Sequence, residues 1–368
     1  MSPRLYSLVV FTIDLFWLQL QFYKTMKSSL FEYRLLPEMI AQVPSTNRSS
    51  CRLINVAADG ILEDRYFYDL PSMLNSKDLL VLNNTRVLSA RITAYKKLGG
   101  GRADILIERQ TGPYNCVAQI RASNNPKAGS CLVTQGGSQF LVEDRVNQFY
   151  NLSLTSQGVL QEVLEKEGQV PLPPYIRRQP LWFDQQNYQT VYATEPGAIA
   201  APTAGLHFDE NLFLELKNRK VQIEFVTLHI GSGSFQPIRT QNIEDHEMHS
   251  EWISVPEHVV RSINKTRKEG GRVVAVGTTV VRALESAVQN GEIVPTEGYT
   301  NLYIVPGFNF QIVDVLITNF HQPKSSLFVL VSAFFGLEAI RQVYSHAMSN
   351  GYRFYSYGDA MRLVRKDS

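Results

Sequence analysis

The feature that most constrains this fold is a change in the spacing of apolar residues along the chain. Between residues 78 and 154 the apolar runs are short and bounded by turn residues, and no long helical pattern separates them. Consecutive short strands of this kind are typical of a small barrel or sandwich. The pattern predicts an all-β module there, closed by a helix at 159–168 and followed by a proline-rich segment at 170–180.

Beyond residue 188 the apolar residues take helical spacing in some segments and form buried, strand-like runs in others. Helices are expected at 210–220, 258–270, 280–291 and 337–351, and strands at 221–230, 272–277, 300–305 and 313–320. Such alternation predicts an α/β fold, namely a three-layer α/β domain with an inserted all-β, barrel-like domain. The predicted division gives residues 28–85 and 165–368 to an α/β catalytic domain and residues 86–164 to the inserted β-barrel.

Composition excludes some classes of protein. The chain has 368 residues, is 44% hydrophobic and carries a formal net charge of +2. This content excludes a disordered chain, and the charge neither demands nor excludes a nucleic-acid partner that binds a local basic patch. Three widely spaced cysteines without a CxxC pair favour neither a disulfide framework nor a thiolate metal site. A reducing, cytoplasmic location is expected.

The N-terminal segment 5–23 is strongly apolar and lies between Arg4 and Lys24, as in a signal peptide or membrane anchor. However, Asp14 lies in mid-span, where a carboxylate costs about 2.5–3.5 kcal/mol on insertion scales. We therefore expect residues 1–27 to be an extension upstream of the true start, with Met26 as the start. An anchor or docking helix is the alternative.

All seven histidines follow residue 200, and several flank expected element ends, where α/β proteins place their sites. In the small-residue segment before the helix at 210–220, Thr203 and His207 offer polar contacts, and Asp209 is the expected N-cap. After the strand at 221–230, Gly231 and Gly233 form a Gly-Ser turn that can admit a nucleotide or sugar close to the backbone.

The segment 244–251 places four acidic residues and two histidines within eight positions. A metal site is one interpretation, but the HxxH spacing has no obvious third ligand and is poor for zinc. The better interpretation is that a carboxylate raises the basicity of a histidine. Asp245 beside His246 would then form a general base or acid near neutral pH.

A second group of polar residues lies where expected strands end. Thr278 and Thr279 fall between a strand and a helix, where hydroxyl groups and free N–H groups can hold a carboxylate or phosphate, and Arg282 can add an ion pair one turn later. The GxGxxG spacing of a dinucleotide site is absent from the sequence here. Asn319 and His321 form a polar pair at another strand end.

Ten motifs occur in order along the chain: RSSCRL at 48–53, NNTRV at 83–87, PLPPYI at 171–176, YQTVYA at 188–193, APTAGLHF at 201–208, EDHEMHSE at 244–251, VGTTVVRALES at 276–286, PGFNF at 306–310, NFHQP at 319–323 and YGDAM at 357–361. With them the chain closely resembles the S-adenosylmethionine:tRNA ribosyltransferase-isomerase family. The resemblance runs from about residue 28 to residue 364. The chain departs from the family in its apolar N-terminus and at Gln322, where leucine is common.

The resemblance implies a fold of an α/β domain with an inserted β-barrel. It implies an enzyme that moves the ribosyl part of S-adenosylmethionine to 7-aminomethyl-7-deazaguanine at the wobble position of tRNA. The product is epoxyqueuosine, an intermediate of queuosine biosynthesis, and adenine and methionine are released. S-adenosylmethionine is consumed as a co-substrate, no metal is expected, and a cytoplasmic monomer without a stable membrane partner is expected.

Roles for the candidate residues follow from that chemistry as hypotheses. The predicted catalytic residues are His207, Asp245, His246 and His321. The predicted substrate-binding residues are Thr203, Gly231, Gly233, Thr278, Thr279, Arg282 and Asn319, with the two threonines of the helix start and Arg282 on the methionine carboxylate. Asn319 and His321 are assigned to the ribose or base.

For tRNA, basic groups beside a stacking aromatic suit an anticodon loop with splayed bases. The candidates are Tyr175, Arg177, Arg178, Lys96 and Lys97. Two alternatives remain open at this point. One is a non-catalytic RNA-binding module in which the histidine loops are structural, and the other is a metal-dependent hydrolase built on residues 244–251.

Overall fold

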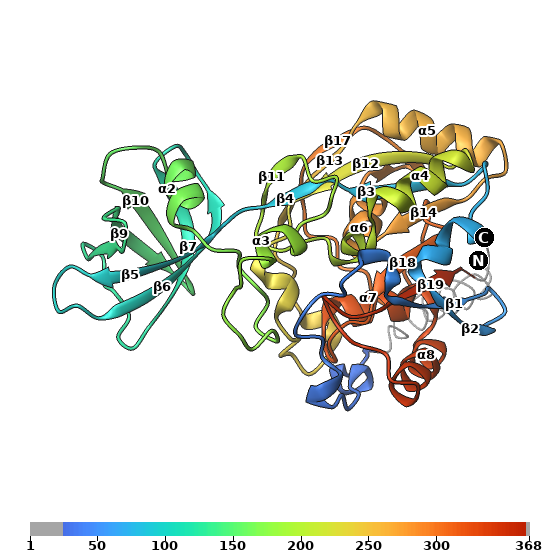
Figure 1. The fold of residues 1–368 in the computed structure, drawn as a ribbon, viewed down its shortest axis with the longest axis horizontal. Helices are drawn as coiled ribbons and strands as arrows, with labels where there is room; N and C mark the ends of the chain where they lie inside the picture. Colours follow the sequence, from blue (N-terminus) through green and yellow to red (C-terminus); the bar gives the residue numbers. More distant parts are fainter. Residues whose placement is uncertain (1–24, 366–368) are drawn as a thin grey trace, which may run out of the picture.

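A computed structural model of the chain describes residues 25–365, so the apolar segment at 5–23 lies outside the described residues. A small β-barrel and a larger α/β body are joined by a narrow waist (Figure 1). This arrangement confirms the predicted fold class, an α/β domain with an inserted all-β domain.

The α/β body is built on one nine-stranded mixed sheet. Its four central strands β12, β3, β14 and β18 run parallel to one another, and antiparallel pairs flank them. In their order across the sheet the strands are β17 (Thr296–Thr300), β13 (Glu251–Val255), β12 (Gln222–Leu228), β3 (Leu79–Asn83), β14 (Val273–Val276), β18 (Val315–Asn319), β19 (Ala360–Val364), β1 (Arg52–Val56) and β2 (Leu62–Tyr66).

Helices cover both faces of this sheet, because its central strands are apolar on both sides. In β3, Leu80 and Leu82 face a core shared with α4, whereas Leu79 and Val81 face a core shared with α5 to α8. The helices are α4 (Glu210–Asn218), α5 (Glu257–Lys268), α6 (Thr278–Ser286), α7 (Ser326–Phe335) and α8 (Leu337–Ser349). Short elements complete the body: α3 (Asp184–Asn187), β15 (Val288–Gln289), β16 (Glu292–Ile293), and the 3-10 turns η4 (Phe67–Met73) and η5 (Thr203–His207).

The smaller domain is a closed antiparallel barrel of six strands. Alternate residues such as Ala103, Ile105 and Ile107 point into its core, and helix α2 (Leu160–Glu167) packs Leu160 and Leu164 against that core. The barrel strands are β5 (Arg91–Lys96), β6 (Arg102–Gln110), β7 (Asn115–Ala122), β8 (Cys131–Thr134), β9 (Gln139–Val146) and β10 (Phe149–Leu154).

Two short parallel strands, β4 (Thr85–Val87) and β11 (Glu195–Ala198), form the waist (Figure 1). The barrel strands fall within residues 86–164, where we predicted the inserted domain, but α2 belongs to the barrel core and extends to Glu167. The division at residues 85/86 and 164/165 therefore stays a prediction.

Most expected elements of the body are present, but two expectations are wrong. The helix expected at 280–291 ends at Ser286, and β15 follows it. The strand expected at 300–305 lies earlier, because β17 ends at Thr300. The following apolar residues, including Ile304, enter the core as irregular chain instead of pairing in the sheet. Asp209 is the N-cap of α4, as predicted, and accepts a hydrogen bond from the backbone N–H of Leu212 at 2.9 Å.

In residues 25–365, no single helix is long and apolar enough to cross a membrane. Helices α7 and α8 meet that criterion only as a pair, and they are bent by 112° at the break between them. Most side chains of α7 are buried in the core of the body, which explains why this helix is apolar on every side.

Candidate active site

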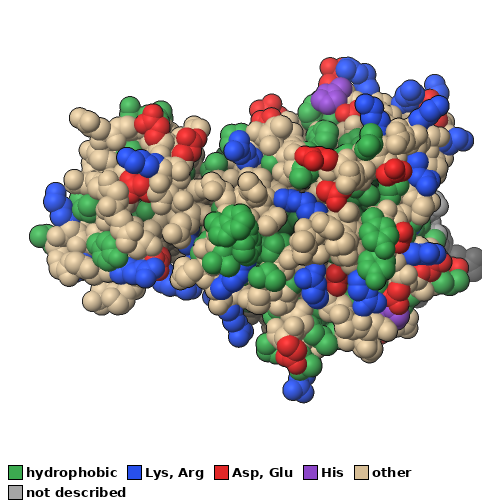
Figure 2. Space-filling view, in the orientation of Figure 1, with side chains coloured by type: hydrophobic (Ala, Val, Ile, Leu, Met, Phe, Trp, Pro, Cys, Tyr) green, Lys and Arg blue, Asp and Glu red, His purple; other side chains and the backbone are tan. Residues whose placement is uncertain are grey.

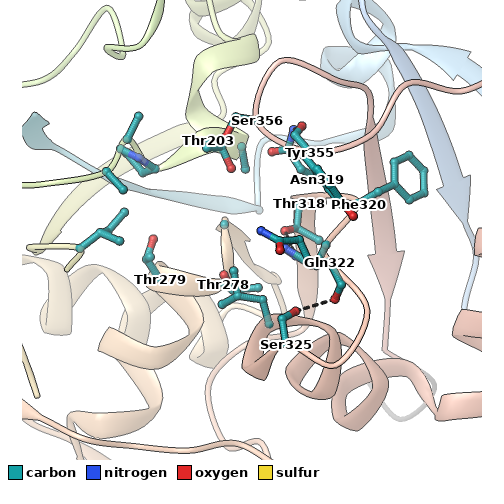
Figure 3. Close-up of a pocket in the computed structure, with 18 of the residues that line it drawn as sticks. Thr203, Thr278, Thr279, Thr318, Asn319, Phe320, Gln322, Ser325, Tyr355 and Ser356 are labelled. Carbon is teal, nitrogen blue, oxygen red and sulfur yellow. Dashed lines mark hydrogen bonds between the residues drawn. The ribbon is translucent and has the colours of Figure 1, made fainter. Parts of the chain in front are cut away.

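The parallel strands of the body end at one edge of the sheet, and a pocket lies there. Strands β12, β14 and β18 lead directly into Ile230, Gly277 and Phe320, which line it. The η5 turn contributes Thr203 from another side. Figure 3 shows Thr203, Thr278, Thr279 and Asn319 around this pocket. This is the position where open α/β sheets bind ligands.

The start of α6 forms one wall of the pocket. Gly277 has a φ of +93°, a value that strains any other residue, and it turns the chain from β14 into the helix. Thr278 and Thr279 follow and line the pocket. The hydroxyl of Thr279 accepts a hydrogen bond of 3.3 Å from the amide of Asn83. The first N–H groups of α6 thus lie at the pocket, as the sequence predicted, where they favour an anion.

Arg282, one turn into α6, also lines the pocket and is 3% exposed. Its Nη1 forms a buried ion pair with the carboxylate of Glu251, and its Nε donates to the carbonyl of Leu302 at 3.0 Å. Its Nη2 donates to no acceptor among the described residues. An unsatisfied buried donor costs about 1–3 kcal/mol, and an anionic ligand in the pocket would recover this cost.

Asn319, at the end of β18, presents a fixed amide to the pocket. Its Nδ2 lies 3.0 Å from Nε2 of His207 and 3.0 Å from the carbonyl of Tyr355, so both acceptors require the amine end of the amide on that side. Its Oδ1 is buried and receives no hydrogen bond from the residues that the structure describes. The two acceptors therefore fix the orientation of the Asn319 amide and leave its Oδ1 without a partner among the described residues.

His207 lies behind Asn319 and is not among the residues that line the pocket. Because Nε2 accepts from Asn319, the ring proton is on Nδ1, which donates to the Sγ of Cys51 at 3.1 Å. Burial lowers the pKa of His207 to about 3, so the ring is neutral and keeps Nε2 available as an acceptor. This geometry favours a role in orienting Asn319, and the predicted catalytic role of His207 gains no support from it.

His321 is the predicted histidine that lines the pocket. Its Nε2 shares a hydrogen bond of 2.9 Å with the hydroxyl of Thr318, and its backbone N–H donates to the phenol of Tyr344 at 2.8 Å. Burial lowers the pKa of His321 to about 3. The imidazole is therefore neutral and is a weak base.

The residues of 244–251 are arranged differently from the prediction. The carboxylate of Asp245 accepts from the amide of Asn242 at 3.1 Å, and the ring of His246 stands edge-on to Tyr303 at 5.4 Å. Burial, followed by the nearby His249, lowers the pKa of His246, so the expected rise in basicity is absent. The segment supplies Glu251 to the pocket wall through its ion pair with Arg282.

The glycine turn after β12 is connected to the pocket through Glu251, the ion-pair partner of Arg282. The backbone N–H of Gly231 donates to Oε1 of Glu251 at 2.9 Å. Gly233 packs against the ring of His249, where an added Cβ would lie 2.1 Å from the ring Cδ2. Neither glycine lines the pocket, whereas the preceding Ile230 does.

The five predicted RNA-binding residues do not form one surface. Tyr175 lines the pocket, with its hydroxyl 2.6 Å from that of Ser356 and its ring tilted against Tyr355 at 4.7 Å. Arg178 forms an ion pair of 2.6 Å with the fully buried Asp184, so its guanidinium already has a structural partner. Arg177 is exposed. Lys96 and Lys97 lie on the barrel, where they donate to the carbonyl of Asn124 and to the side chain of Gln139.

The sequence did not single out several pocket residues. They are uncharged and lie near the end of β18, in the loop after it, or in the loop before β19: Thr318, Phe320, Gln322, Ser325, Tyr355 and Ser356. Figure 3 shows them opposite the start of α6. Only their proximity to the NFHQP and YGDAM motifs could have indicated them. Within residues 25–365, no group of three or more His, Cys, Asp or Glu residues is arranged to hold a metal ion, and the absence of a metal stays a prediction.

The fold and the pocket define an α/β protein with a barrel insertion and a polar ligand site at its parallel strand ends. Residues 28–363 match the family described as "Queuosine biosynthesis protein". The S-adenosylmethionine:tRNA ribosyltransferase-isomerases of Azoarcus sp. (strain BH72) and Nitrosococcus oceani are each 48% identical to the chain, which covers 97% and 98% of them, with 92% of this chain aligned in both cases.

A crystal structure of S-adenosylmethionine tRNA ribosyltransferase from Thermotoga maritima is also similar. It is 32% identical, has a TM-score of 0.53, and is matched over 91% of this chain and 100% of that one. The chain therefore belongs to the queuosine biosynthesis family of S-adenosylmethionine:tRNA ribosyltransferase-isomerases. It is an enzyme of that family, as the ten sequence motifs predicted.

The two buried histidines predict how stability depends on pH. His207 and His321 are neutral in the folded protein down to a pH of about 3, whereas a histidine in an unfolded chain titrates near 6.5. Below about pH 6.5 the unfolded chain binds protons that the folded chain does not, so acid favours unfolding. For each pH unit by which the pH falls below about 6.5, we expect each of these histidines to lower the free energy of unfolding by about 1.4 kcal/mol.

Urea unfolding at pH 5, 6 and 7 measures this dependence. The variant His321→Gln should show a shallower dependence than the wild type, and His258→Gln, which alters an exposed side chain on α5, should not. An equal slope in wild type and His321→Gln would contradict the expectation.

Proposed function

We propose that this enzyme transfers the ribosyl group of S-adenosylmethionine to 7-aminomethyl-7-deazaguanine at the tRNA wobble position and isomerises it, which forms epoxyqueuosine and releases adenine and methionine. The observation that carries the proposal is the pair of unsatisfied polar atoms at one pocket, Nη2 of Arg282 and Oδ1 of Asn319. The related enzymes, which are S-adenosylmethionine:tRNA ribosyltransferase-isomerases, indicate the class of reaction. A cytoplasmic monomer is part of the proposal, since tRNA is its substrate.

The pocket suits the chemical groups of S-adenosylmethionine. Arg282 and the first N–H groups of α6 supply donors for the methionine carboxylate. The Oδ1 of Asn319 can accept a hydrogen bond from an amino or ribose hydroxyl group. Ile230 and Leu327 supply apolar surface against which an adenine ring can pack.

The reaction sets clear demands on these residues. The sulfonium group acidifies the neighbouring ribose 5′ carbon, so loss of that proton can open the ring and expel adenine. The amine of the deazaguanine then attacks the resulting vinyl sulfonium, and closure to the cyclopentane epoxide expels methionine. The steps need a base for the proton of the 5′ carbon, an acid for the departing adenine and a fixed order of contacts, but no change of oxidation state by an external reagent.

Proton transfer is proposed for His321, because of the predicted histidines it is the one that lines the pocket. Its low pKa means that bound ligand must make it more basic, which a carboxylate held nearby can do. The neutral His207 holds Asn319 in place. For tRNA, Tyr175 can stack a base inside the pocket, and Arg177, Lys96 and Lys97 can contact the phosphate backbone. Figure 2 shows Lys and Arg side chains on both domains.

The proposed activity predicts one measurable product pattern. Incubation with S-adenosylmethionine and tRNA that carries the aminomethyl-deazaguanine should release one adenine per modified tRNA, and nucleoside mass analysis should show epoxyqueuosine. Activity should survive treatment with a chelator. A non-catalytic RNA-binding module would bind tRNA without releasing adenine, and a metal-dependent hydrolase would lose activity after chelation.

Replacing Arg282 should separate binding from folding. Arg282→Lys keeps a cation beside the buried Glu251 but removes the guanidinium nitrogen Nη2, so we expect S-adenosylmethionine affinity to fall about 10-fold to 100-fold, the worth of one hydrogen bond between charged groups. Isothermal titration calorimetry measures this, with thermal unfolding as the check on the fold. Arg261→Lys, on the exposed face of α5, is the control. An unchanged affinity would remove Arg282 from the carboxylate site.

His321→Gln tests proton transfer. Glutamine keeps a donor and an acceptor but cannot relay a proton, so turnover should fall about 10²-fold to 10⁴-fold while S-adenosylmethionine affinity changes little. Single-turnover adenine release and calorimetry give the two quantities. A loss of less than about tenfold in turnover would assign His321 to hydrogen bonding alone.

A further inference from the structure

The turn that follows β12 lies between carboxylates from two different domains. Glu108 belongs to β6 of the barrel, and Glu251 begins β13 of the body. A Cβ added to Gly231 would lie 4.0 Å from a carboxylate oxygen of each. The backbone N–H of Gly231 donates to Glu251, and the next one, that of Ser232, donates to Glu108. Successive peptide groups thus connect the two domains.

On the barrel side the contact is a small closed network. Glu108 accepts from both the backbone N–H of Ser232, at 3.3 Å, and the hydroxyl of Ser232. Gln119, on the neighbouring strand β7, donates to Glu108 at 2.7 Å and to the hydroxyl of Ser232 at 2.9 Å. The barrel therefore holds Ser232 through two side chains on paired strands.

On the body side the same turn leads to the pocket. Glu251 accepts from Gly231 at one oxygen and from Arg282 at the other. That ion pair fixes the guanidinium whose Nη2 is unsatisfied among the described residues. A displacement of the turn would remove a donor from Glu251 and so change the position or the charge balance of Arg282.

A second contact ties the same region to the barrel. Phe149, on β10, meets the ring of His249 edge-on with centroids 6.3 Å apart. His249 in turn packs against Gly233, in the turn that Glu108 holds. Three barrel strands, β6, β7 and β10, therefore contact one turn and the segment beside it.

We propose that Glu108 of the barrel is a positioning residue for the S-adenosylmethionine pocket: through the turn at Gly231 and Ser232 it holds Glu251, and through Glu251 it holds Arg282. The pocket is then complete only while the barrel is docked on the body. The role rests on the proposed function, because it assumes that Arg282 binds S-adenosylmethionine. It assigns to the barrel a part in binding the small substrate as well as any part in binding RNA.

The test is S-adenosylmethionine binding by calorimetry without tRNA, so that RNA contacts of the barrel do not enter. Glu108→Ala should weaken binding about tenfold, as expected for a lost charged hydrogen bond. Glu108→Gln, which keeps one acceptor, should weaken it less. With tRNA present, the KM for S-adenosylmethionine should rise while kcat stays within about threefold of wild type. Thermal unfolding shows whether each variant is folded.

The decisive measurement is a double-mutant cycle with Arg282→Lys. If Glu108 acts through Arg282, the loss caused by Glu108→Ala should shrink to less than about threefold in the Arg282→Lys background. The control is Glu143→Ala, which removes an exposed carboxylate from β9 of the same barrel and should not alter binding.

Each other outcome overturns a different claim. Unchanged binding by Glu108→Ala, additive losses in the cycle, or an equal loss in Glu143→Ala would overturn the positioning role and leave the proposed function standing. A wild-type protein that does not bind S-adenosylmethionine would overturn the proposed function, and the positioning role with it.

Discussion

The buried ion pair between Arg282 and Glu251 connects the parts of the site more than any other contact. Burying two charges carries a desolvation cost, which the pair offsets only with good geometry and further hydrogen bonds. Those bonds come from Gly231 to Glu251, and from Arg282 to the carbonyl of Leu302. One interaction thus fixes helix α6, the start of β13, the turn after β12 and the chain after β17 relative to one another, and it leaves one guanidinium nitrogen for a ligand.

The rest of the pocket depends on where the strands place its polar groups and on the neutral charge of its two buried histidines. Parallel strands bring Asn319 and the start of α6 to one sheet edge, where helix N–H groups and an oriented amide supply directional contacts. Burial keeps His207 and His321 uncharged, so their rings act first as hydrogen-bonding groups. An enzyme whose substrate already carries an activating sulfonium and a leaving group gains most from ordering its contacts, and this pocket is suited to that task.

Sequence patterns predicted the fold class and several pocket residues. They failed where a contact was inferred only because two residues are neighbours in the sequence. The change from short strands to alternating helices and strands gave the barrel and the α/β body. The threonines at 278 and 279 and Asn319 were found because strand ends are recognisable. The expected pairing of Asp245 with His246 is not seen, because Asp245 accepts a hydrogen bond from Asn242 and the His246 ring packs against Tyr303. The strand expected at 300–305 was wrong because apolar residues also fill a core as irregular chain.

The sequence by itself determined the kind of protein, because ordered motifs and the periodicity of apolar residues are local properties that survive without coordinates. Only the tertiary structure decided which histidine lines the pocket, which partners the lysines and arginines have, and that Glu108 contacts Ser232. These facts depend on side-chain directions and on contacts between residues more than a hundred positions apart, as in the 124-residue separation of Glu108 and Ser232. A contact of this kind cannot be predicted from neighbouring residues, because the packing of two whole domains determines it.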